Sequence, residues 1–169
     1  MKQNDLHIIL HCLPREIDEL DRIVNHLKRS SHFLDDNDEV ILDFTLNLSD
    51  KLTDWETSKL PKEFFADKFE MMKQRCDWTS KNIFEINDSN RCLGINDKRR
   101  NSIRENNPKN FMYLDTDVYF SMFNLSYLFR AMEQIDNEYY ILNSQLLRLW
   151  DESWNMISND RYLSLIHIS

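Results

Sequence analysis

The sequence predicts an α/β fold with a mostly parallel central sheet flanked by helices. Short apolar segments alternate along the chain with segments of helical periodicity, which is the pattern of βαβ units. The apolar segments are nearly continuous, as expected of strands whose two faces are both covered. A chain of 169 residues with 41% hydrophobic and 12% aromatic residues fits a globular domain with a good core. We therefore expect a single domain over residues 1–169.

The first βαβ unit is expected in the N-terminal part. Residues 6–13 form an apolar run that predicts a buried strand, and Pro14 ends it. Apolar residues then recur at helical spacing from Ile17 to about residue 31. Residues 39–46 predict the second strand. Because one helix separates the two strands, they should be parallel and joined by a right-handed crossover.

The alternation continues to the end of the chain. The further elements are expected in this order: a helix at 62–78, a strand at 82–86, a helix from Asn96 or Asp97 to before Pro108, a strand at 111–114, a helix at 124–134 capped by Asn124, a strand at 138–142 and a short helix at 143–150. Residues 162–169 form a strand-like tail that no further element closes. We therefore expect a domain that is incomplete at its C-terminus.

Composition excludes several classes of protein. The formal net charge of −8 argues against nucleic acid as a partner. Gly94 is the single glycine, so a Walker loop and a dinucleotide fingerprint are both excluded. No run of 18 apolar residues occurs, so no membrane span is expected. The three cysteines, Cys12, Cys76 and Cys92, lack CxxC spacing and predict reduced thiols in a cytoplasmic protein.

Asp115 and Asp117 are the strongest candidates for chemistry. They follow an apolar run, at the carboxyl end of a predicted strand, where open α/β sheets bind ligands. Hard oxygen ligands there suit Mg²⁺ or Mn²⁺ carrying a substrate diphosphate. The spacing alone is weak, because Asp36 and Asp38 repeat it in a polar loop. A strand-end turn with solvated acids is therefore the alternative.

Asp97, Lys98, Arg99 and Arg100 open a predicted helix. Three cations in a first turn oppose the helix macrodipole, which prefers acids there. Either a bound anion compensates, or the side chains extend into water at a cost of roughly a few tenths of a kcal/mol. Gly94, three residues before Asp97, favours a ligand because a solitary glycine suits a turn or a close backbone approach.

Other polar side chains carry weaker signals. His7 and His11 share one face of the first strand, and polar-tipped core residues are favoured over a metal pair. Asp151 and Glu152 are candidate general bases, although an isolated acid pair usually faces solvent. A haloacid-dehalogenase-like phosphatase is disfavoured, because most of that domain would have to follow Asp117.

The order of these parts resembles the A-type glycosyltransferase fold (GT-A), especially the family 2-like enzymes. The resemblance covers roughly residues 5–155. It rests on a first strand with a loop containing Leu13 and Pro14, a second strand, a glycine and basic segment opening a helix, and a strand ending in Asp115-Thr116-Asp117. Family members usually continue further and often have a third metal ligand, commonly His. The expected truncation at the C-terminus agrees with this difference.

The resemblance implies a metal-dependent, nucleotide-sugar-dependent glycosyltransferase of the hexosyltransferase type. It would move a sugar from a UDP- or GDP-linked donor to an acceptor that the sequence does not identify. Asp117 would contact Mn²⁺ or Mg²⁺, and Asp115 the ribose or the metal shell. Asp151 is the first choice for the catalytic base and Glu152 the second.

The resemblance also assigns the nucleotide contacts. Leu13 and Pro14 would lie against the nucleotide, and Gly94, Asp97 and Arg100 would hold the base, ribose or phosphate. Two other functions stay open. One is a non-catalytic α/β binding or interaction module, and the other is a metal-dependent nucleotidyltransferase that uses a strand-end acid pair.

Overall fold

The computed structural model describes residues 4–53, 57, 59–79, 81–89, 95–118 and 121–135. All helices and strands within these ranges belong to one compact unit, Met1–Glu133. The elements predicted at 138–142, 143–150 and 162–169 lie outside the described residues. A single domain over the whole chain therefore stays a prediction.

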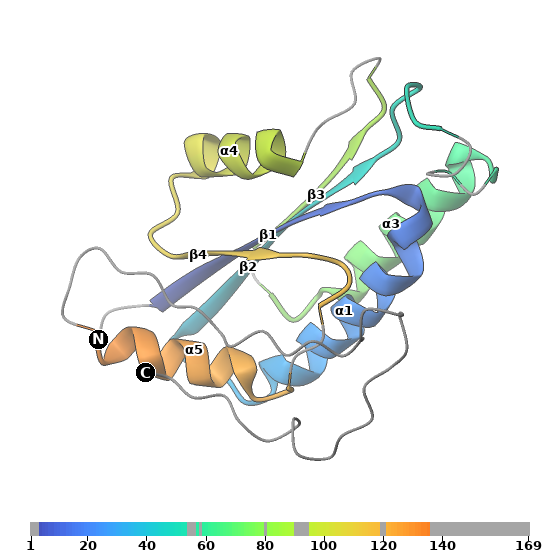
Figure 1. Ribbon diagram of the computed structural model, residues 1–169. Helices are drawn as coiled ribbons and strands as arrows, with labels where there is room; N and C mark the ends of the chain where they lie inside the picture. Colours follow the sequence, from blue (N-terminus) through green and yellow to red (C-terminus); the bar gives the residue numbers. More distant parts are fainter. Residues whose placement is uncertain are drawn as a thin grey trace, which may run out of the picture. The chain divides into compact units, whose positions relative to one another are not determined.

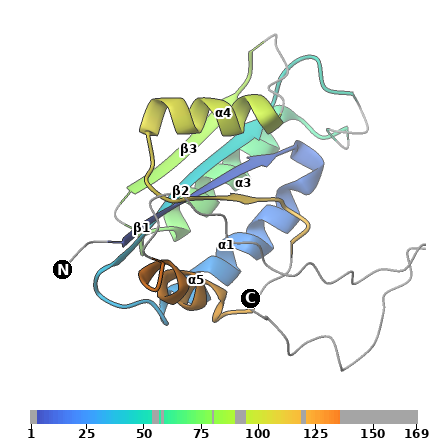
Figure 2. The same ribbon diagram turned by 60° about the vertical axis from the view of Figure 1, so that its left-hand side comes forward.

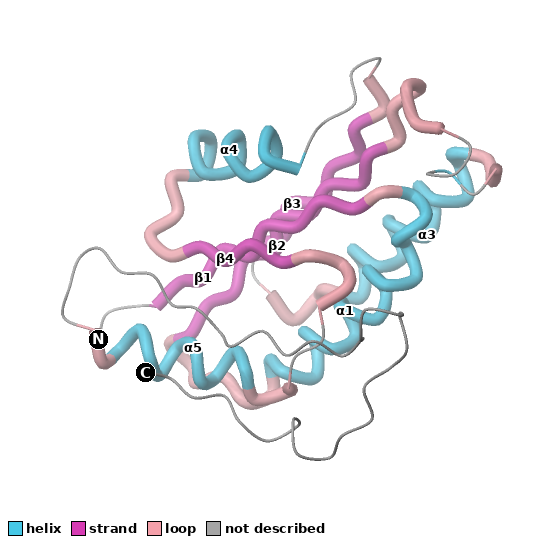
Figure 3. Tube along the Cα trace, in the orientation of Figure 1, coloured by secondary structure: helices cyan, strands magenta, loops and turns pink. Residues whose placement is uncertain are grey.

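The described strands form one parallel sheet in the order β3-β2-β1-β4 (Figure 3). They are β1 (Asn4–Cys12), β2 (Asp38–Asn47), β3 (Lys81–Asn87) and β4 (Phe111–Leu114). Every pairing is parallel. Their ends lie within two residues of those predicted. The predicted class, an α/β fold with a parallel sheet flanked by helices, is confirmed.

The helices also follow the predicted order. They are the 3₁₀ helix η1 (Pro14–Glu16), α1 (Ile17–Ser31), α3 (Lys62–Arg75), α4 (Ile95–Asn106) and α5 (Asn124–Glu133). Helix α3 was expected to reach Trp78, but it ends at Arg75 and Cys76 begins a turn. The predicted cap of α5 is wrong, because Asn124 is the first residue of the helix and its Oδ1 accepts no hydrogen bond. Before the helix, the Ser121 hydroxyl accepts the Phe123 N–H at 3.3 Å.

The hydrophobic core lies between the sheet and helices α1, α3 and α5, which cover one face (Figure 1). Side chains alternate between the faces of a strand, so the even-numbered residues of β1 and β2 point into this core. The helices contribute apolar residues spaced three and four apart. Each large side chain buried in this way contributes about 1.5–3 kcal/mol. Fully buried examples are Leu20, Ile23, Leu42, Phe44, Phe69 and Phe129.

Helix α4 covers the opposite face of the sheet (Figure 2). This face is polar where α4 lies on it. His7 of β1, Asp43 and Thr45 of β2 are all buried there, and Glu85 of β3 lies beside them. The two faces of the sheet therefore differ, because the helices on one face pack through apolar side chains and α4 packs on the other through polar and charged ones.

The strand order reverses at β1. The chain moves outward from β1 to β2 and β3, and β4 then pairs with the other side of β1. The helix that connects β3 to β4 accordingly lies on the face opposite to α1 and α3 (Figure 1). The loops after β1 and β4 therefore meet at the point where strand order reverses, which is where open α/β sheets bind ligands.

Strand β4 differs from its prediction. Its apolar sequence indicated a strand covered on both faces, but Phe111 and Tyr113 are 45% and 42% exposed. The strand lies at an edge of the described sheet, and only Met112 and Leu114 face the core. The two exposed rings contact each other, with 5.3 Å between their centroids. An apolar run alone does not distinguish buried aliphatic residues from half-exposed aromatic ones.

Candidate functional site at the carboxyl edge of the sheet

The loop after β1 is held rigid by its own residues. Glu16 accepts the Leu13 N–H at 2.9 Å through Oε2, and the Glu16 N–H donates to the Leu13 carbonyl at 2.9 Å. Pro14 between them is buried and begins the 3₁₀ helix, where a fixed φ and a missing N–H are both tolerated. This reciprocal bonding gives the Leu13–Pro14 segment one conformation.

The turn after β4 presents Asp115 and Asp117 on either side of a buried residue. Thr116 is only 7% exposed, whereas both acids are exposed. The turn is closed by the Val118 N–H, which donates to the Asp115 carbonyl at 3.3 Å. Both carboxylates therefore reach solvent, while a hydrogen bond closes the backbone between them.

Arg22 of α1 ties this turn to the rest of the protein. Its guanidinium donates to the carbonyl oxygens of Thr116, at 2.8 Å, and Val118, at 3.1 Å. Because α1 begins directly after η1, the same helix carries the loop after β1 and holds the turn after β4. The position of one loop relative to the other is thus determined by α1.

Asp115 already has a partner in the chain. Nη2 of Arg99 in α4 donates to Asp115 Oδ1 at 2.8 Å. The Arg99 guanidinium also lies over the ring of Tyr113, with Cζ 4.6 Å from the ring centroid. A guanidinium over an aromatic face is attracted by the ring quadrupole. Tyr113 and Asp115 together therefore hold Arg99 beside the turn.

Asp117 interacts electrostatically with the loop after β1. The pKa of Glu16 is raised, mainly by burial and further by repulsion from Glu19 and Asp117. The Leu13 N–H and Arg15 oppose this rise but do not cancel it. Two acids from the two loops therefore repel each other at the reversal point.

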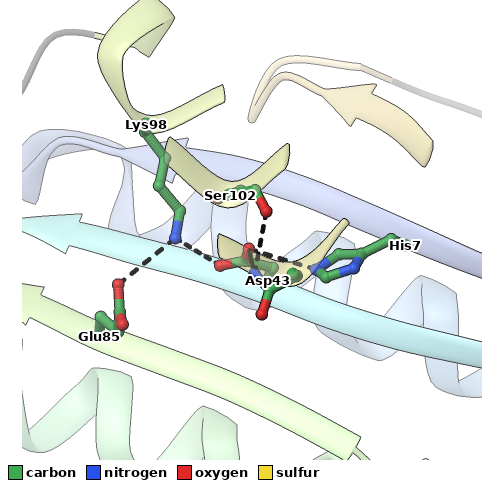
Figure 4. Close-up of polar contacts among 6 residues, drawn as sticks. His7, Asp43, Glu85, Lys98 and Ser102 are labelled. Carbon is green, nitrogen blue, oxygen red and sulfur yellow. Dashed lines mark hydrogen bonds and ion pairs between the residues drawn. The ribbon is translucent and has the colours of Figure 1, made fainter. Parts of the chain in front are cut away.

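A buried ionic cluster lies under α4 (Figure 4). The Lys98 ammonium pairs with Asp43 Oδ1 and lies 3.5 Å from Glu85 Oε2. Lys98 and Asp43 are 4% and 0% exposed. His7 Nε2 lies 3.2 Å from Asp43 Oδ2, and both side chains are buried. Charges this deep are found paired, because an isolated ion is too costly to remove from water.

The Asp43 carboxylate joins α4 to the sheet. Besides Lys98, it accepts the Asn106 amide at 3.4 Å, and the Ser102 hydroxyl points to it (Figure 4). Burial alone would raise the pKa of Asp43, but hydrogen bonds from His7, Lys98 and Ser102 outweigh burial and lower it. Asp43 is therefore an ionised carboxylate inside the protein.

Two of the three cations of α4 fit neither explanation offered by the sequence, whereas Arg100 is 60% exposed, as the second explanation expects. Lys98 is buried against Asp43, Arg99 pairs with Asp115, and Arg100 lies 3.7 Å from Asp97. Two of the three are thus neutralised by carboxylates of the sheet or its edge. For His7, the polar core interpretation is supported, because it is buried against Asp43.

The predicted site residues are partly brought together. Leu13, Pro14, Asp115 and Asp117 lie in the two loops that meet where the strand order reverses. Asp97 and Arg100 pair with each other on α4. Arg99, which lies between Lys98 and Arg100 in the sequence, reaches Asp115 instead. Three further residues with predicted roles lie outside the described residues: Gly94, Asp151 and Glu152.

Sequence reasoning missed three residues of this region, and it named a fourth, Arg99, only as one of the cations that open a predicted helix. Asp43 had a signal, because a charge inside an apolar strand requires a buried partner. The sequence also carried a signal for Glu16, because an acid three residues after a helix N-cap residue can accept the backbone N–H of that residue. Arg22 had no signal, because its partner Thr116 lies 94 residues away in the chain. The sequence also did not show that Arg99 pairs with Asp115, 16 residues away.

The donor chemistry of the turn fits a divalent cation. Carboxylate oxygens are the ligands of Mg²⁺ and Mn²⁺, and Mg²⁺ is usually held by one or two carboxylates together with substrate phosphates. Within the ranges that the structure describes, no three His, Cys, Asp or Glu side chains lie close enough to hold a metal. Asp115 and Asp117 alone therefore do not form a complete metal site within those ranges.

No protein-family model, curated protein or solved structure matches the chain. Among the described helices, none is both long and apolar enough to span a bilayer. The class that the structure defines is an α/β protein with a candidate ligand site at the carboxyl edge of a parallel sheet.

Proposed function

We propose that the chain contains the donor site of a metal-dependent glycosyltransferase that uses a nucleoside-diphosphate sugar. One observation carries the proposal. The Asp115–Asp117 turn lies beside the Leu13–Pro14 loop at the point where strand order reverses, and Arg22 holds the turn in place. Exposed carboxylates on a fixed turn at this edge suit a cation with a diphosphate.

Four of the described residues have a part in this proposal. Asp117 and Asp115 hold Mn²⁺ or Mg²⁺ together with the donor phosphates. The bound ion neutralises the charge that develops on the diphosphate leaving group. Leu13 and Pro14 form a rigid wall for the nucleotide. A rigid wall lowers the entropy lost on binding.

The remaining parts of the proposal rest on the sequence. Asp151 or Glu152 is proposed as the base that activates the acceptor, and Gly94 as a nucleotide contact. The proposed location is the cytoplasm, with which the buried, unpaired thiols of Cys12 and Cys76 agree.

A non-catalytic binding module is the second candidate, and one contact favours it. Asp115 is already paired with Arg99, as a structural acid would be. A nucleotidyltransferase would instead respond to nucleoside triphosphates. Both alternatives are distinguished by which ligand stabilises the protein and whether a metal is needed.

The test is thermal unfolding of the full chain with UDP, GDP and their sugar conjugates, in Mn²⁺ and then in EDTA. A ligand at 100 times its dissociation constant adds about 2.7 kcal/mol, which raises the midpoint by several degrees. We expect a metal-dependent rise with one of the two nucleotides. Asp117→Asn should fold normally and lose that rise.

The chain offers a matched control for this variant. Asp36→Asn removes an exposed acid from the second Asp-x-Asp sequence, which runs from the loop before β2 to Asp38, the first residue of that strand. It should keep the full metal-dependent rise. An equal rise in Asp117→Asn would refute the site, and a response to triphosphates alone would favour the nucleotidyltransferase.

A further inference from the structure

Arg99 occupies the place where a cation would bind. Its Nη2 lies 2.8 Å from Asp115 Oδ1, one of the two oxygens of a carboxylate in the proposed metal site. A guanidinium and a divalent cation on the same carboxylate repel each other, because both are positively charged. Binding of a metal to Asp115 therefore weakens the ion pair with Arg99.

The ion pair is suited to such an exchange. The Asp115 side chain is 54% exposed and that of Arg99 is 25% exposed, so water weakens their attraction. Tyr113 gives Arg99 a second contact that does not involve Asp115, since the guanidinium lies over its ring at 4.6 Å. When Asp115 is taken, Arg99 still stays at the site.

The helix that carries Arg99 is anchored independently. Lys98, Ser102 and Asn106 are spaced four residues apart and all point to Asp43. The backbone of α4 is therefore held to the sheet by contacts that do not involve Arg99. Only the Arg99 side chain has to move.

We propose that Arg99 neutralises Asp115 in the ligand-free protein and binds the donor diphosphate once a divalent cation has taken Asp115. This inference rests on the proposed function. The guanidinium fork matches phosphate oxygens in a bidentate manner, so the same side chain serves a carboxylate first and a phosphate next. Arg99 thus makes metal and nucleotide binding depend on each other.

The experiment measures two affinities in the full chain and three variants. Free Mn²⁺ is followed by electron paramagnetic resonance with MnCl₂ alone, and UDP and GDP are titrated calorimetrically in saturating Mn²⁺. Arg99→Gln removes the charge and Asp115→Asn removes the shared carboxylate. Arg104→Gln is the matched control, because Arg104 is an exposed arginine of the same helix. Far-UV circular dichroism verifies the fold of each variant.

We expect opposite effects in Arg99→Gln. Mn²⁺ alone should bind about threefold more tightly, because it no longer competes with a guanidinium in an exposed ion pair. The nucleotide should bind about tenfold more weakly, because a charged hydrogen-bond donor to phosphate is lost. Arg104→Gln should change neither affinity, and Asp115→Asn should weaken Mn²⁺ binding.

The outcomes separate this inference from the proposed function. If UDP or GDP binds with Mn²⁺ and Arg99→Gln behaves like Arg104→Gln, the role of Arg99 is refuted and the donor site stands. If Mn²⁺ binds more tightly to Arg99→Gln but no nucleotide binds to any form, the phosphate step and the proposed donor are refuted. If Mn²⁺ binds to no form, both proposals are overturned.

Discussion

At the scale of single residues, the Asp43 carboxylate is the described group that depends most on its hydrogen-bond and ion-pair partners. It is fully buried and ionised, and it faces His7 from β1 and Lys98, Ser102 and Asn106 from α4. Removing one partner of a buried pair leaves the other charge without compensation. The stability of the α4 layer therefore depends on this carboxylate.

Asp43→Ala should lower the free energy of unfolding by about 3–5 kcal/mol at neutral pH, because Lys98 is left buried and unpaired. The difference should shrink in acid. The pKa of Asp43 is lowered from 3.8, so its contribution is complete above that value and is lost as pH falls through the lowered pKa. Urea denaturation of both forms at pH 7 and pH 3 measures this.

Glu85→Ala is the control, because Glu85 is 58% exposed and lies 3.5 Å from the same ammonium. It should change stability by no more than about 0.5 kcal/mol. Equal losses in the two variants would contradict the special position of Asp43, as would a loss that does not depend on pH.

At the scale of elements, α1 connects the two loops of the candidate site. It follows η1 directly and sends Arg22 to the turn after β4. Arg22→Ala should lower the free energy of unfolding by about 1–3 kcal/mol, because two carbonyl groups lose a charged donor. Hydrogen exchange at the Val118 amide, which closes the turn, should become faster. Urea denaturation and exchange mass spectrometry measure the two effects.

Arg29→Ala is the matched control on the same helix, where the side chain is exposed. It should leave both stability and exchange at Val118 within error of the unmodified protein. If Val118 exchanges at its normal rate in Arg22→Ala, the turn is held by something other than α1.

Elements of this fold could be predicted wherever a local pattern determines them. The spacing of apolar residues in 17–31 gave both ends of α1, and Pro108 set a limit for α4. The environment of β4 could not be predicted, because Phe111 and Tyr113 look the same in sequence whether buried or exposed. The ionic docking of α4 was also beyond local patterns, since Lys98 and Asp43 are 55 residues apart.

The candidate site was predictable only in its acids and its first loop. A strand followed by Asp-x-Asp is a local feature, so Asp115 and Asp117 could be found. Their partners Arg99 and Arg22 depend on how α4 and α1 cross the sheet, and topology determines those crossings. Prediction from the sequence therefore reached the ligating groups but not the groups that neutralise and position them.

At the scale of the whole molecule, two cysteines can report on unfolding. Cys12 and Cys76 are buried free thiols. Burial raises the pKa of Cys76 to about 12, and burial with Glu16 and Glu19 raises the pKa of Cys12 well above its usual value. The reactive thiolate is therefore scarce in the folded state. Neither thiol should react at pH 8 before the core opens.

Labelling of a Cys92→Ser variant with a disulfide reagent at pH 8 measures this directly. We expect both remaining thiols to react together, at a rate that rises with urea in parallel with unfolding followed by circular dichroism. Rapid labelling of either thiol in buffer without urea would show that the core opens locally around it.

The unequal faces of the sheet have a consequence for temperature. The layer of α1, α3 and α5 is held by apolar burial, which weakens on cooling. The α4 layer is held by buried charges, whose removal from water becomes less costly as temperature rises. The contacts on the two faces of the described sheet are therefore most stabilising at different temperatures.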